Sequence, residues 1–403
     1  MSVRSEWVFL YQAGWHRRYL NLSQQKCWDR FFLWKGAGME GYSMYFPCYT
    51  IGHGVYEKVG KVCRDYGTSA VIIGGHKALA AARKKLEESC REGQIDITGV
   101  LWYGGECSYE NVEKLAASAA VQEAQLLFAV GGGKVMDTVK ALGEQINKAV
   151  FAFPTITSNC AGCTSVSIMY HPDGSFQKPF FITRPPLHTF LDLDIIAEAP
   201  SRYMWAGMGD TYAKFFEADM SSRGEELSHY VGLGVTISRM CLDPILKYGE
   251  QALLDNKAGR ASQALENVVL AINVTTALTS ILVTKDKIID YNTGLAHAIN
   301  YGLTSYPEVE HNHLHGEIVS FGVLVLLLIE SQIDPAYRKV FDRMLAFSRS
   351  VELPVRLEDL GLTEADTDAV IDKALAMPDI DHNPYPITRE MLVRAFADLR
   401  AVL

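Results

Sequence analysis

The stretch Leu126–Lys140 reads LLFAVGGGKVMDTVK, and it decides the fold. Its five leading residues are apolar and predict a buried strand, which runs directly into Gly131, Gly132 and Gly133. A helical pattern begins at Lys134. Glycines let the backbone come close to a ligand, and a helix N-terminus presents free N–H groups and a positive dipole end. The junction therefore predicts a site for a nucleotide pyrophosphate, although a tight structural turn would use the same glycines.

The residues on both sides of this junction alternate between short apolar runs and helical patterns. Before about residue 200 we predict a strand and turn at 49–54, strands at 69–73, 99–103, 126–130 and 150–153, and helices at 77–90 and 109–120. This alternation is typical of βαβ units with a parallel sheet. After residue 200 the strand signals vanish, and we predict helices at 202–220, 228–248, 263–282, 286–301 and 315–330.

These patterns predict an α/β, Rossmann-like nucleotide-binding domain at 39–199 and an all-α domain at 200–403. The cleft between two such domains is the default place for an active site. Residues 1–38 fit neither domain, and they hold four of the six tryptophans: Trp7, Trp15, Trp28 and Trp34. The string KGAGM at 35–39 is also what a purine-rich ribosome-binding site and a start codon give when translated in frame. We hypothesise that the natural chain begins near Met39, the alternative being a genuine N-terminal extension.

Composition limits the classes of partner. The 403-residue chain is 48% hydrophobic and carries a formal net charge of −9, which argues against nucleic acid or an anionic membrane. We find no apolar stretch long enough to span a bilayer; the run at 318–329 predicts a buried helix. The eight scattered cysteines suit reduced thiols in a cytoplasmic protein. We expect a cytoplasmic homo-oligomer that acts on a small molecule.

The whole string around the glycines resembles a known nucleotide loop. Three glycines followed by Lys134, Asp137 and Lys140 are similar to the cofactor loop of the iron-containing alcohol dehydrogenase and glycerol dehydrogenase superfamily. The string PTITS at 154–158 resembles the second cofactor loop of that family, and the resemblance runs from about Tyr45 to the C-terminus. It implies a dehydroquinate synthase-like fold and an enzyme that transfers hydride to or from NAD(H) or NADP(H). It also implies further cofactor contacts from Thr155, Ser158, Thr164, Val166 and Tyr170.

Three later motifs contain one carboxylate and two imidazoles, a set that binds a divalent first-row metal and leaves positions open. The motifs are GMGDTYAKFFEA at 207–218, GLAHAINYG at 294–302 and LHGE at 314–317. A lone helical histidine is more often a structural residue. Together and in this order, Asp210, His297 and His315 match the ligand set of the family, which implies that they hold the catalytic metal. His311 and His313 are expected to be loop residues.

The resemblance also bears on the identity of the metal. Four-ligand, iron-binding relatives carry a histidine one helical turn after the aspartate, where this chain has Lys214. The site therefore resembles the three-ligand, zinc-type glycerol dehydrogenases, and zinc is expected ahead of iron.

Two departures from the polyol-specific pattern concern the substrate. Cys160 stands where those relatives carry an aspartate that reads hydroxyl groups, and a thiol is a weak donor and acceptor. Lys214 shares a helix face with Asp210 and would attract an anion. These features resemble the hydroxycarboxylate dehydrogenase branch, so the first expectation is a 2-oxo acid and the alternative is glycerol or another polyol. Cys160 and Cys163 spell Cys-x-x-Cys but lack a thioredoxin context, so a redox role is disfavoured.

Two other functional classes compete with a dehydrogenase. Dehydroquinate synthases share the fold but carry a glutamate among their metal ligands and several basic groups for a phosphate, and this chain shows neither feature. A catalytically inactive binding protein is disfavoured by the complete ligand set.

The adenosine end of the cofactor is expected at the strand that ends in Gly74. NAD-preferring relatives carry an aspartate at this point, which binds the ribose hydroxyls and repels a 2′-phosphate. Glycine leaves room for that phosphate, and Lys77 and His76 could meet its charge. We therefore predict that NADPH is accepted, whereas a plain structural turn at Gly74 would carry no such preference.

Overall fold

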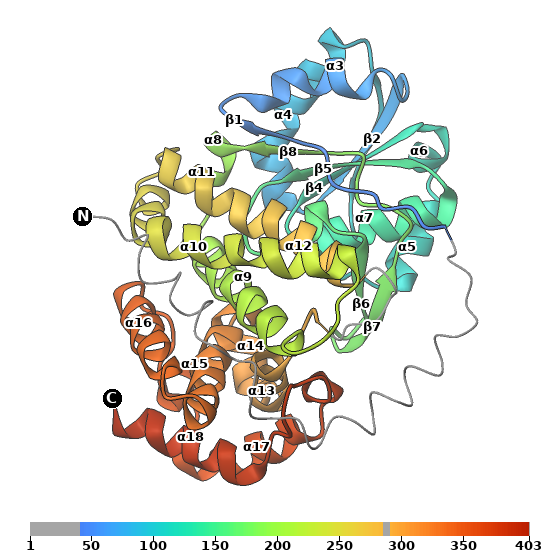
Figure 1. The fold of residues 1–403 in the computed structure, drawn as a ribbon. Coiled ribbons are helices and arrows are strands. Elements are labelled where there is room, and N and C mark those ends of the chain that lie inside the picture. Colours follow the sequence, from blue (N-terminus) through green and yellow to red (C-terminus); the bar gives the residue numbers. More distant parts are fainter. Residues whose placement is uncertain (1–40, 285–290, 403) are drawn as a thin grey trace. The chain divides into compact units, whose positions relative to one another are not determined.

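The computed structural model shown in Figure 1 describes residues 41–284 and 291–402. The chain divides into two compact units, Met1–Met44 and Tyr45–Leu403, and the fold below is that of the second unit. The predicted leader at 1–38, including its proposed start near Met39, lies outside the described residues. The predicted boundary at 199/200 stays a prediction.

Six strands of the described region form one parallel sheet in the order β1-β8-β5-β4-β2-β3. They are β1 (Tyr49–Gly52), β2 (Ser69–Gly74), β3 (Asp96–Trp102), β4 (Leu126–Gly131), β5 (Ala149–Pro154) and β8 (His188–Asp192). In the register of the ladder Gly74 lies opposite Val130, and Gly131 lies opposite Pro154. The glycine-ended strands therefore finish at the same edge, the carboxyl edge where open α/β sheets bind ligands.

Helices cover both faces of this sheet because alternate strand residues point to opposite faces. In β2, Val71 and Ile73 join one apolar core, and Ala70 and Ile72 join the other. The first core is completed by α5 (Tyr109–Ala116), α6 (Ala119–Glu123) and α7 (Gly133–Ile146). The second is completed by η1 (Val55–Lys58), α3 (Val59–Cys63), α4 (His76–Glu92) and α8 (Leu193–Ala197). The single helix predicted at 109–120 is interrupted, because Ser118 adopts an extended conformation and starts α6.

Three strands of the described region were not predicted: β8 of the parallel sheet, and two strands outside that sheet. The strands β6 (Val166–Tyr170) and β7 (Phe176–Phe181) form an antiparallel ribbon, preceded by the short turn η2 (Ala161–Cys163). The turn between them has Gly174 at φ 89°, a left-handed conformation that favours glycine. The strand β7 is largely exposed and contains Pro179, so it lacks the apolar run on which the strand prediction depends.

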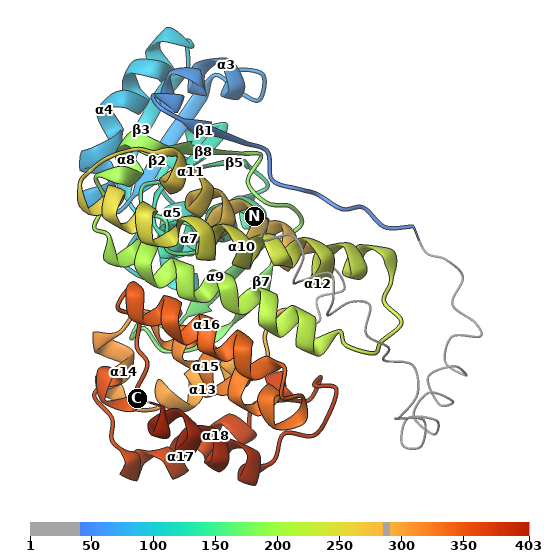
Figure 2. The ribbon, with the colours of Figure 1, turned by 60° about the vertical axis from the view of Figure 1, so that its left-hand side comes forward.

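Beyond β8 the described residues form helices and turns and no strand, as predicted. The helices are α9 (Arg202–Ser221), α10 (His229–Lys257), α11 (Gln263–Leu270), η3 (Ala271–Thr275, a π-helix), α12 (Thr276–Val283), α13 (Leu295–Leu303), α14 (Pro307–Asn312), α15 (His315–Ile333), α16 (Tyr337–Ser350), α17 (Thr367–Leu375) and α18 (Arg389–Ala401). Short turns η4 (Leu357–Leu360), η5 (Glu364–Asp366) and η6 (Pro378–Ile380) join the last ones. In both views α17 and α18, drawn in red, lie at the end of the helical region away from the sheet (Figures 1 and 2).

The helix predicted at 286–301 is wrong at its start. Residues 285–290 lie outside the described part, and Tyr291–Gly294 is not helical. The helix α13 begins only at Leu295 because tertiary hydrogen bonds hold the preceding segment: Lys214 binds Asn292, and Glu217 binds the N–H of Gly294.

The expectation that no stretch is long enough to span a membrane also needs correction. Two helical stretches of the described chain, Gln263–Val283 and His315–Ile333, are long and apolar enough by length and composition. Their apolar windows are 72% and 78% buried inside the protein. Such burial is typical of the core helices of a globular protein, so these stretches are weak evidence for a membrane span.

Candidate metal centre and cofactor loop

The structure brings the three predicted metal ligands together from three different helices. Asp210 lies on α9, His297 on α13 and His315 at the first residue of α15. Their ligand atoms all lie within 4.8 Å of one another. The Nε2 atoms of His297 and His315 lie 3.7 and 3.8 Å from Asp210 Oδ1. Ligand atoms about 2.0–2.2 Å from a tetrahedral zinc ion are separated by roughly 3.5 Å, so the donor set and its spacing fit a divalent metal ion.

Glycines allow the three ligand-bearing helices to approach this closely. A Cβ atom on Gly209 would lie 2.2 Å from the carbonyl oxygen of Gly316, and a Cβ on Gly316 would lie 2.1 Å from that of Ala206. The helices α9 and α15 therefore cross in backbone contact beside Asp210 and His315. A Cβ on Gly322 would lie 2.4 Å from the carbonyl oxygen of Ala296, so α13 and α15 cross in the same way beside His297.

The Glu217 carboxylate holds the back of the His297 ring. Oε2 accepts a hydrogen bond from Nδ1 of His297 at 2.7 Å, which leaves Nε2 on the side of Asp210. Burial alone would lower the pKa of His297, but the Glu217 carboxylate raises it above its usual value. Burial would likewise raise the pKa of Glu217, yet His297 and Lys214 hold it below its usual range, so the carboxylate is ionised at neutral pH. His315, by contrast, has a side chain that is 53% exposed, although its Nε2 lies 3.8 Å from Asp210 Oδ1.

Lys214 does not present a free ammonium group to the centre. Its side chain is buried, and Nζ donates to the backbone carbonyl of Asn292 and, at 2.9 Å, to Asn292 Oδ1. We expected this lysine to attract an anionic substrate. In the structure it has another role, because its hydrogen bonds to Asn292 hold the segment before α13 against α9.

The glycine loop has the predicted form. The strand β4 ends at Gly131 and α7 begins at Gly133, with no side chain capping the helix N-terminus at Gly132. Its first N–H groups are therefore available to a phosphate. Lys134 is half exposed and pairs with Glu106 Oε2 at 2.5 Å.

A second loop connects the glycine loop to the metal centre. A Cβ atom on Gly133 would lie 2.6 Å from Asn159 Nδ2, so the two loops touch. A Cβ on Gly207, one turn before Asp210, would lie 2.9 Å from the carbonyl oxygen of Thr157. The loop between Pro154 and Cys160 therefore lies against both the glycine loop and the helix α9 that carries Asp210.

The predicted cofactor residues occupy this second loop and the ribbon that follows it. Thr155 and Thr164 are buried, whereas Ser158, Val166 and Tyr170 are partly exposed. Lys140 Nζ donates to Thr164 Oγ1 at 3.0 Å and to the Val166 carbonyl.

The buried ion pair of Asp137 and Lys140 fastens α7 to this ribbon. Lys140 Nζ lies 2.9 Å from Asp137 Oδ1, and Asp137 Oδ2 accepts a hydrogen bond from the N–H of Ile168 at 3.2 Å. Burial raises the pKa of Asp137, although the lysine lowers it in part. The structure therefore places Asp137 inside the protein, where it supports the ribbon of β6 and β7.

The thiols of the Cys-x-x-Cys motif are poor nucleophiles. Burial raises the pKa of Cys160 to about 12, with a further contribution from the charge of Asp210. Burial also raises the pKa of Cys163 to about 11. Both cysteines are free, and both thiols are protonated at neutral pH, which agrees with the absence of a redox role in the prediction.

The turn after β2 has room for a side chain at Gly75 but not at Gly74. Gly74 is buried, and a Cβ on it would lie 2.6 Å from the backbone carbonyl oxygen of Val130. A Cβ on Gly75 would meet only Tyr103 Cε1, at an ordinary 3.7 Å. Gly75 caps α4 without a side-chain hydrogen bond, next to the exposed His76, which stacks on Trp102. A side chain therefore does not fit at Gly74 without a shift of the backbone, and Gly75 is the position that can carry one.

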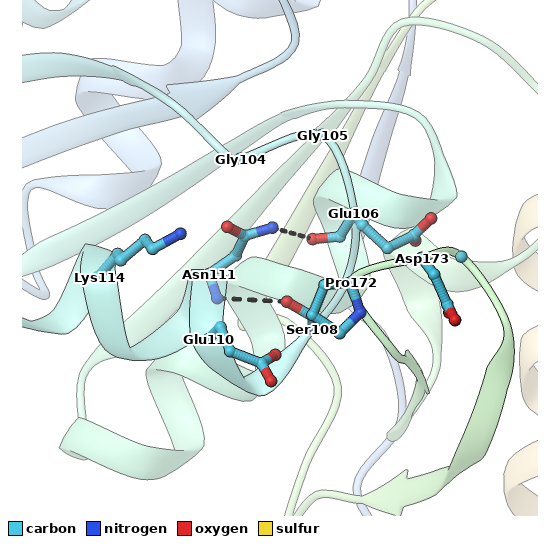
Figure 3. A pocket seen from close by; sticks show the side chains of 10 residues that line it. Gly104, Gly105, Glu106, Ser108, Glu110, Asn111, Lys114, Pro172 and Asp173 are labelled. Carbon is cyan, nitrogen blue, oxygen red and sulfur yellow. Dashed lines mark hydrogen bonds between the residues drawn. The ribbon is translucent and has the colours of Figure 1, made fainter.

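A hollow of about 480 Å³ lies beside the glycine loop and is shown in Figure 3. It is lined by Gly104, Gly105, Glu106, Ser108, Glu110, Asn111, Lys114, Pro172, Asp173 and Gly174. The Asn111 side chain donates to the backbone carbonyl of Glu106 at 2.9 Å, which closes one wall. Three carboxylates against one lysine make the lining unfavourable for a pyrophosphate or a carboxylate. The hollow is therefore not the candidate cofactor site.

Sequence reasoning missed Glu217, Asn292 and the glycines at the helix crossings. Glu217 lies seven residues after Asp210, two helical turns along the same face, and this spacing could have identified it. The glycines next to Asp210 and His315 were also visible as part of the motifs, but their contacts depend on which helices cross.

The fold and the site are those of a nucleotide-dependent metalloenzyme. A parallel α/β sheet carries a glycine loop suited to a phosphate, and the helices that follow it present three potential metal ligands. A family model described as iron-containing alcohol dehydrogenase matches residues 47–190. Glycerol dehydrogenase of Thermotoga maritima is 33% identical over 302 residues, which cover 71% of this chain and 77% of that protein. Hydroxycarboxylate dehydrogenase A of Escherichia coli is 31% identical over 335 residues, covering 81% and 88%. The crystal structure of glycerol dehydrogenase from Schizosaccharomyces pombe superposes with a TM-score of 0.77 and 28% identity, covering 90% of this chain and 91% of that one.

The chain belongs to the iron-containing alcohol dehydrogenase family and is an oxidoreductase. The predicted superfamily and the predicted fold class, an α/β part followed by a helical part, are confirmed.

Proposed function

We propose that this protein is a cytoplasmic, metal-dependent dehydrogenase that moves hydride between NAD(P)(H) and a small polyol or its hydroxycarbonyl counterpart. The observation that carries the proposal is the convergence of Asp210, His297 and His315 on one point, with their ligand atoms within 4.8 Å of one another. One carboxylate and two imidazoles form a three-ligand set with an open position, for which zinc is the first choice of metal.

The metal ion, when bound, polarises the substrate oxygen as a Lewis acid, and the nicotinamide supplies or takes the hydride. The residues of the chain hold and orient these groups. The uncapped N-terminus of α7 and its glycines offer N–H groups to the pyrophosphate. Ser158 on the second loop and Val166 and Tyr170 on β6 are partly exposed and would contact the cofactor.

The substrate class follows from the state of Lys214 and from the relatives. Asn292 accepts two hydrogen bonds from the Lys214 ammonium. The group that favoured a 2-oxo acid is therefore held by the protein itself and is not free to bind a substrate carboxylate. The relatives named above include two glycerol dehydrogenases and one hydroxycarboxylate dehydrogenase. We therefore favour the polyol class over the 2-oxo acid first expected. Because the Cys160 thiol reads hydroxyl groups weakly, we expect a broad specificity among small diols and hydroxyketones.

The test is an absorbance assay of the zinc-loaded protein, with NADH and NADPH for the reductions and NAD⁺ and NADP⁺ for the oxidation. Dihydroxyacetone and glycolaldehyde should be reduced, and glycerol oxidised, with a higher kcat/KM than 2-oxobutyrate is reduced. Better turnover of 2-oxobutyrate would overturn the polyol class, and no nicotinamide turnover with any of these compounds would overturn the dehydrogenase itself.

Replacing Lys214 by methionine should lower kcat/KM for dihydroxyacetone and for 2-oxobutyrate by a similar factor. The lysine acts on both through the segment that it holds at Asn292, so the ratio of the two values should change by less than about threefold. Asn292→Ala removes the other half of the same contact and should have the same effect. A loss of about tenfold or more for the oxo acid alone, the size expected of one lost charged contact, would show that Lys214 binds a substrate carboxylate.

Replacing Gly75 by aspartate should shift the cofactor preference toward NADH by about tenfold or more in kcat/KM, an effect of about 1.4 kcal/mol. The new carboxylate fits at the N-cap of α4 and repels a 2′-phosphate while accepting hydrogen bonds from the ribose hydroxyls. Gly75→Asn is the matched control, because it caps the helix equally but carries no charge. Steady-state kinetics with each cofactor and one fixed carbonyl substrate give the ratio. A wild-type protein that already favours NADH strongly would contradict the prediction that this turn admits the phosphate.

A further inference from the structure

The Glu217 side chain is buried between two helices that each carry a candidate metal ligand. It lies on α9 seven residues after Asp210, so two helical turns place both carboxylates on one face. The carboxylate accepts three hydrogen bonds, all from the start of α13. Oε2 binds Nδ1 of His297 at 2.7 Å, and Oε1 binds the N–H groups of Gly294 and His297, each at 2.9 Å.

These contacts determine which nitrogen of His297 is free. An ionised carboxylate is an acceptor only, so the hydrogen of the neutral imidazole must be on Nδ1. The lone pair then lies on Nε2, the atom 3.7 Å from Asp210 Oδ1. Neutral histidine binds metals through its unprotonated nitrogen, and the hydrogen bond made by the other nitrogen decides which one that is. Glu217 thus turns the metal-binding nitrogen toward the cluster.

The same carboxylate caps the helix that carries His297. The N-cap of α13 is Gly294, which has no side chain to satisfy the N–H groups of the first turn. Oε1 of Glu217 does this from the neighbouring helix, and its charge suits the positive end of the α13 dipole. A Cβ atom on residue 294 would lie 3.4 Å from Glu217 Cγ, so glycine leaves room for the carboxylate.

We propose that Glu217 is a positioning residue of the metal centre, which fixes both the place of α13 and the tautomer of His297 without touching the ion. The inference rests on the proposed metal site. The ligands Asp210 and His297 are then joined through Glu217 as well as through the ion, so the site is preorganised before a metal arrives.

Glu217→Gln is the informative variant because it keeps the size and reverses one hydrogen bond. The single amide oxygen best serves the two backbone N–H groups, which leaves the amide N–H₂ facing Nδ1 of His297. The ring must then accept at Nδ1 and carry its hydrogen on Nε2, the wrong tautomer for the metal. In metal-free protein, Co²⁺ binding measured against a fluorescent chelator should weaken by about ten- to a hundredfold.

Glu317→Gln is the matched control. Glu317 also accepts from a histidine Nδ1, that of His313 at 2.7 Å, and from one backbone N–H, that of Leu314 at 3.0 Å. Because His313 is not part of the ligand cluster, this variant should bind Co²⁺ as the wild type does. Equal affinity of wild type and Glu217→Gln would overturn the proposal. If the wild type itself bound no metal, the proposed metal site would fail instead.

A second measurement needs no variant of Glu217 and no metal. In protein labelled with ¹⁵N-histidine, at a pH above the raised pKa of His297 so that the ring is neutral, long-range proton–nitrogen correlation should show His297 as the Nδ1–H tautomer, its signals being assigned by their loss in His297→Asn. The Nε2–H tautomer in the wild type would overturn the proposal, even if Glu217→Gln failed to fold.

Discussion

Replacing His315 by alanine is expected to leave the protein folded but unable to retain a metal ion. Its side chain is 53% exposed at the first residue of α15, so truncation opens no buried cavity, and thermal unfolding of the metal-free protein should be nearly unchanged. Loss of one of three ligands should weaken Co²⁺ or Zn²⁺ binding by more than about a hundredfold, because even outer partners of metal ligands contribute ten- to a hundredfold. If the ion supplies about 4 kcal/mol to the transition state, kcat falls about a thousandfold.

The control for this variant lies two residues away. His313 donates through Nδ1 to Glu317 and belongs to no ligand cluster in the described chain. His313→Ala should therefore keep the metal, as measured by elemental analysis after dialysis against a chelator. Retention of a full complement of metal in His315→Ala would remove His315 from the ligand set. The same result in His297→Ala would remove His297.

Two central strands of the sheet could be predicted well because they are buried on both faces, whereas β8 was not predicted. Leu126–Val130 and Val150–Phe153 were placed within one residue of β4 and β5, since uninterrupted apolar runs between glycines and prolines leave few alternatives. The ribbon of β6 and β7 could not be found in this way, because its exposed strand has no apolar run. The start of α13 was mispredicted because local helical propensity was outweighed by hydrogen bonds to Lys214 and Glu217.

The candidate ligands were predictable from their motifs, whereas the way in which they are held was not. Nothing in the order of residues states that α9, α13 and α15 cross at Gly209, Gly316 and Gly322. A glycine next to a ligand looks the same in sequence whether it ends a helix, turns a loop or admits another backbone. Only the crossing shows that these glycines admit another helix backbone, and it also predicts which of them is least replaceable.

Gly316→Ala should therefore weaken metal binding, although Gly316 is not itself a metal ligand. A Cβ on this residue would lie 2.1 Å from the carbonyl oxygen of Ala206 and 3.0 Å from Asp210 Cβ. The first of these is backbone and cannot swing aside, so α15 and α9 must separate by about 1 Å to restore van der Waals contact. Metal–ligand distances tolerate only about 0.2 Å, so the shift should weaken Co²⁺ binding by more than about tenfold. Overpacking should also lower the free energy of unfolding by about 1–3 kcal/mol.

Gly232→Ala in α10 makes the same chemical change in a helix with room for it. The added Cβ would meet only Leu227 Cβ, at 3.9 Å, so this variant should bind metal normally. It should raise the free energy of unfolding by about 0.5–1 kcal/mol, because alanine is the better helix former. Urea unfolding of both metal-free variants, followed by Co²⁺ competition, separates the two effects. A Gly316→Ala protein with wild-type stability and metal affinity would show that the backbone contact between α9 and α15 does not set the distance between Asp210 and His315.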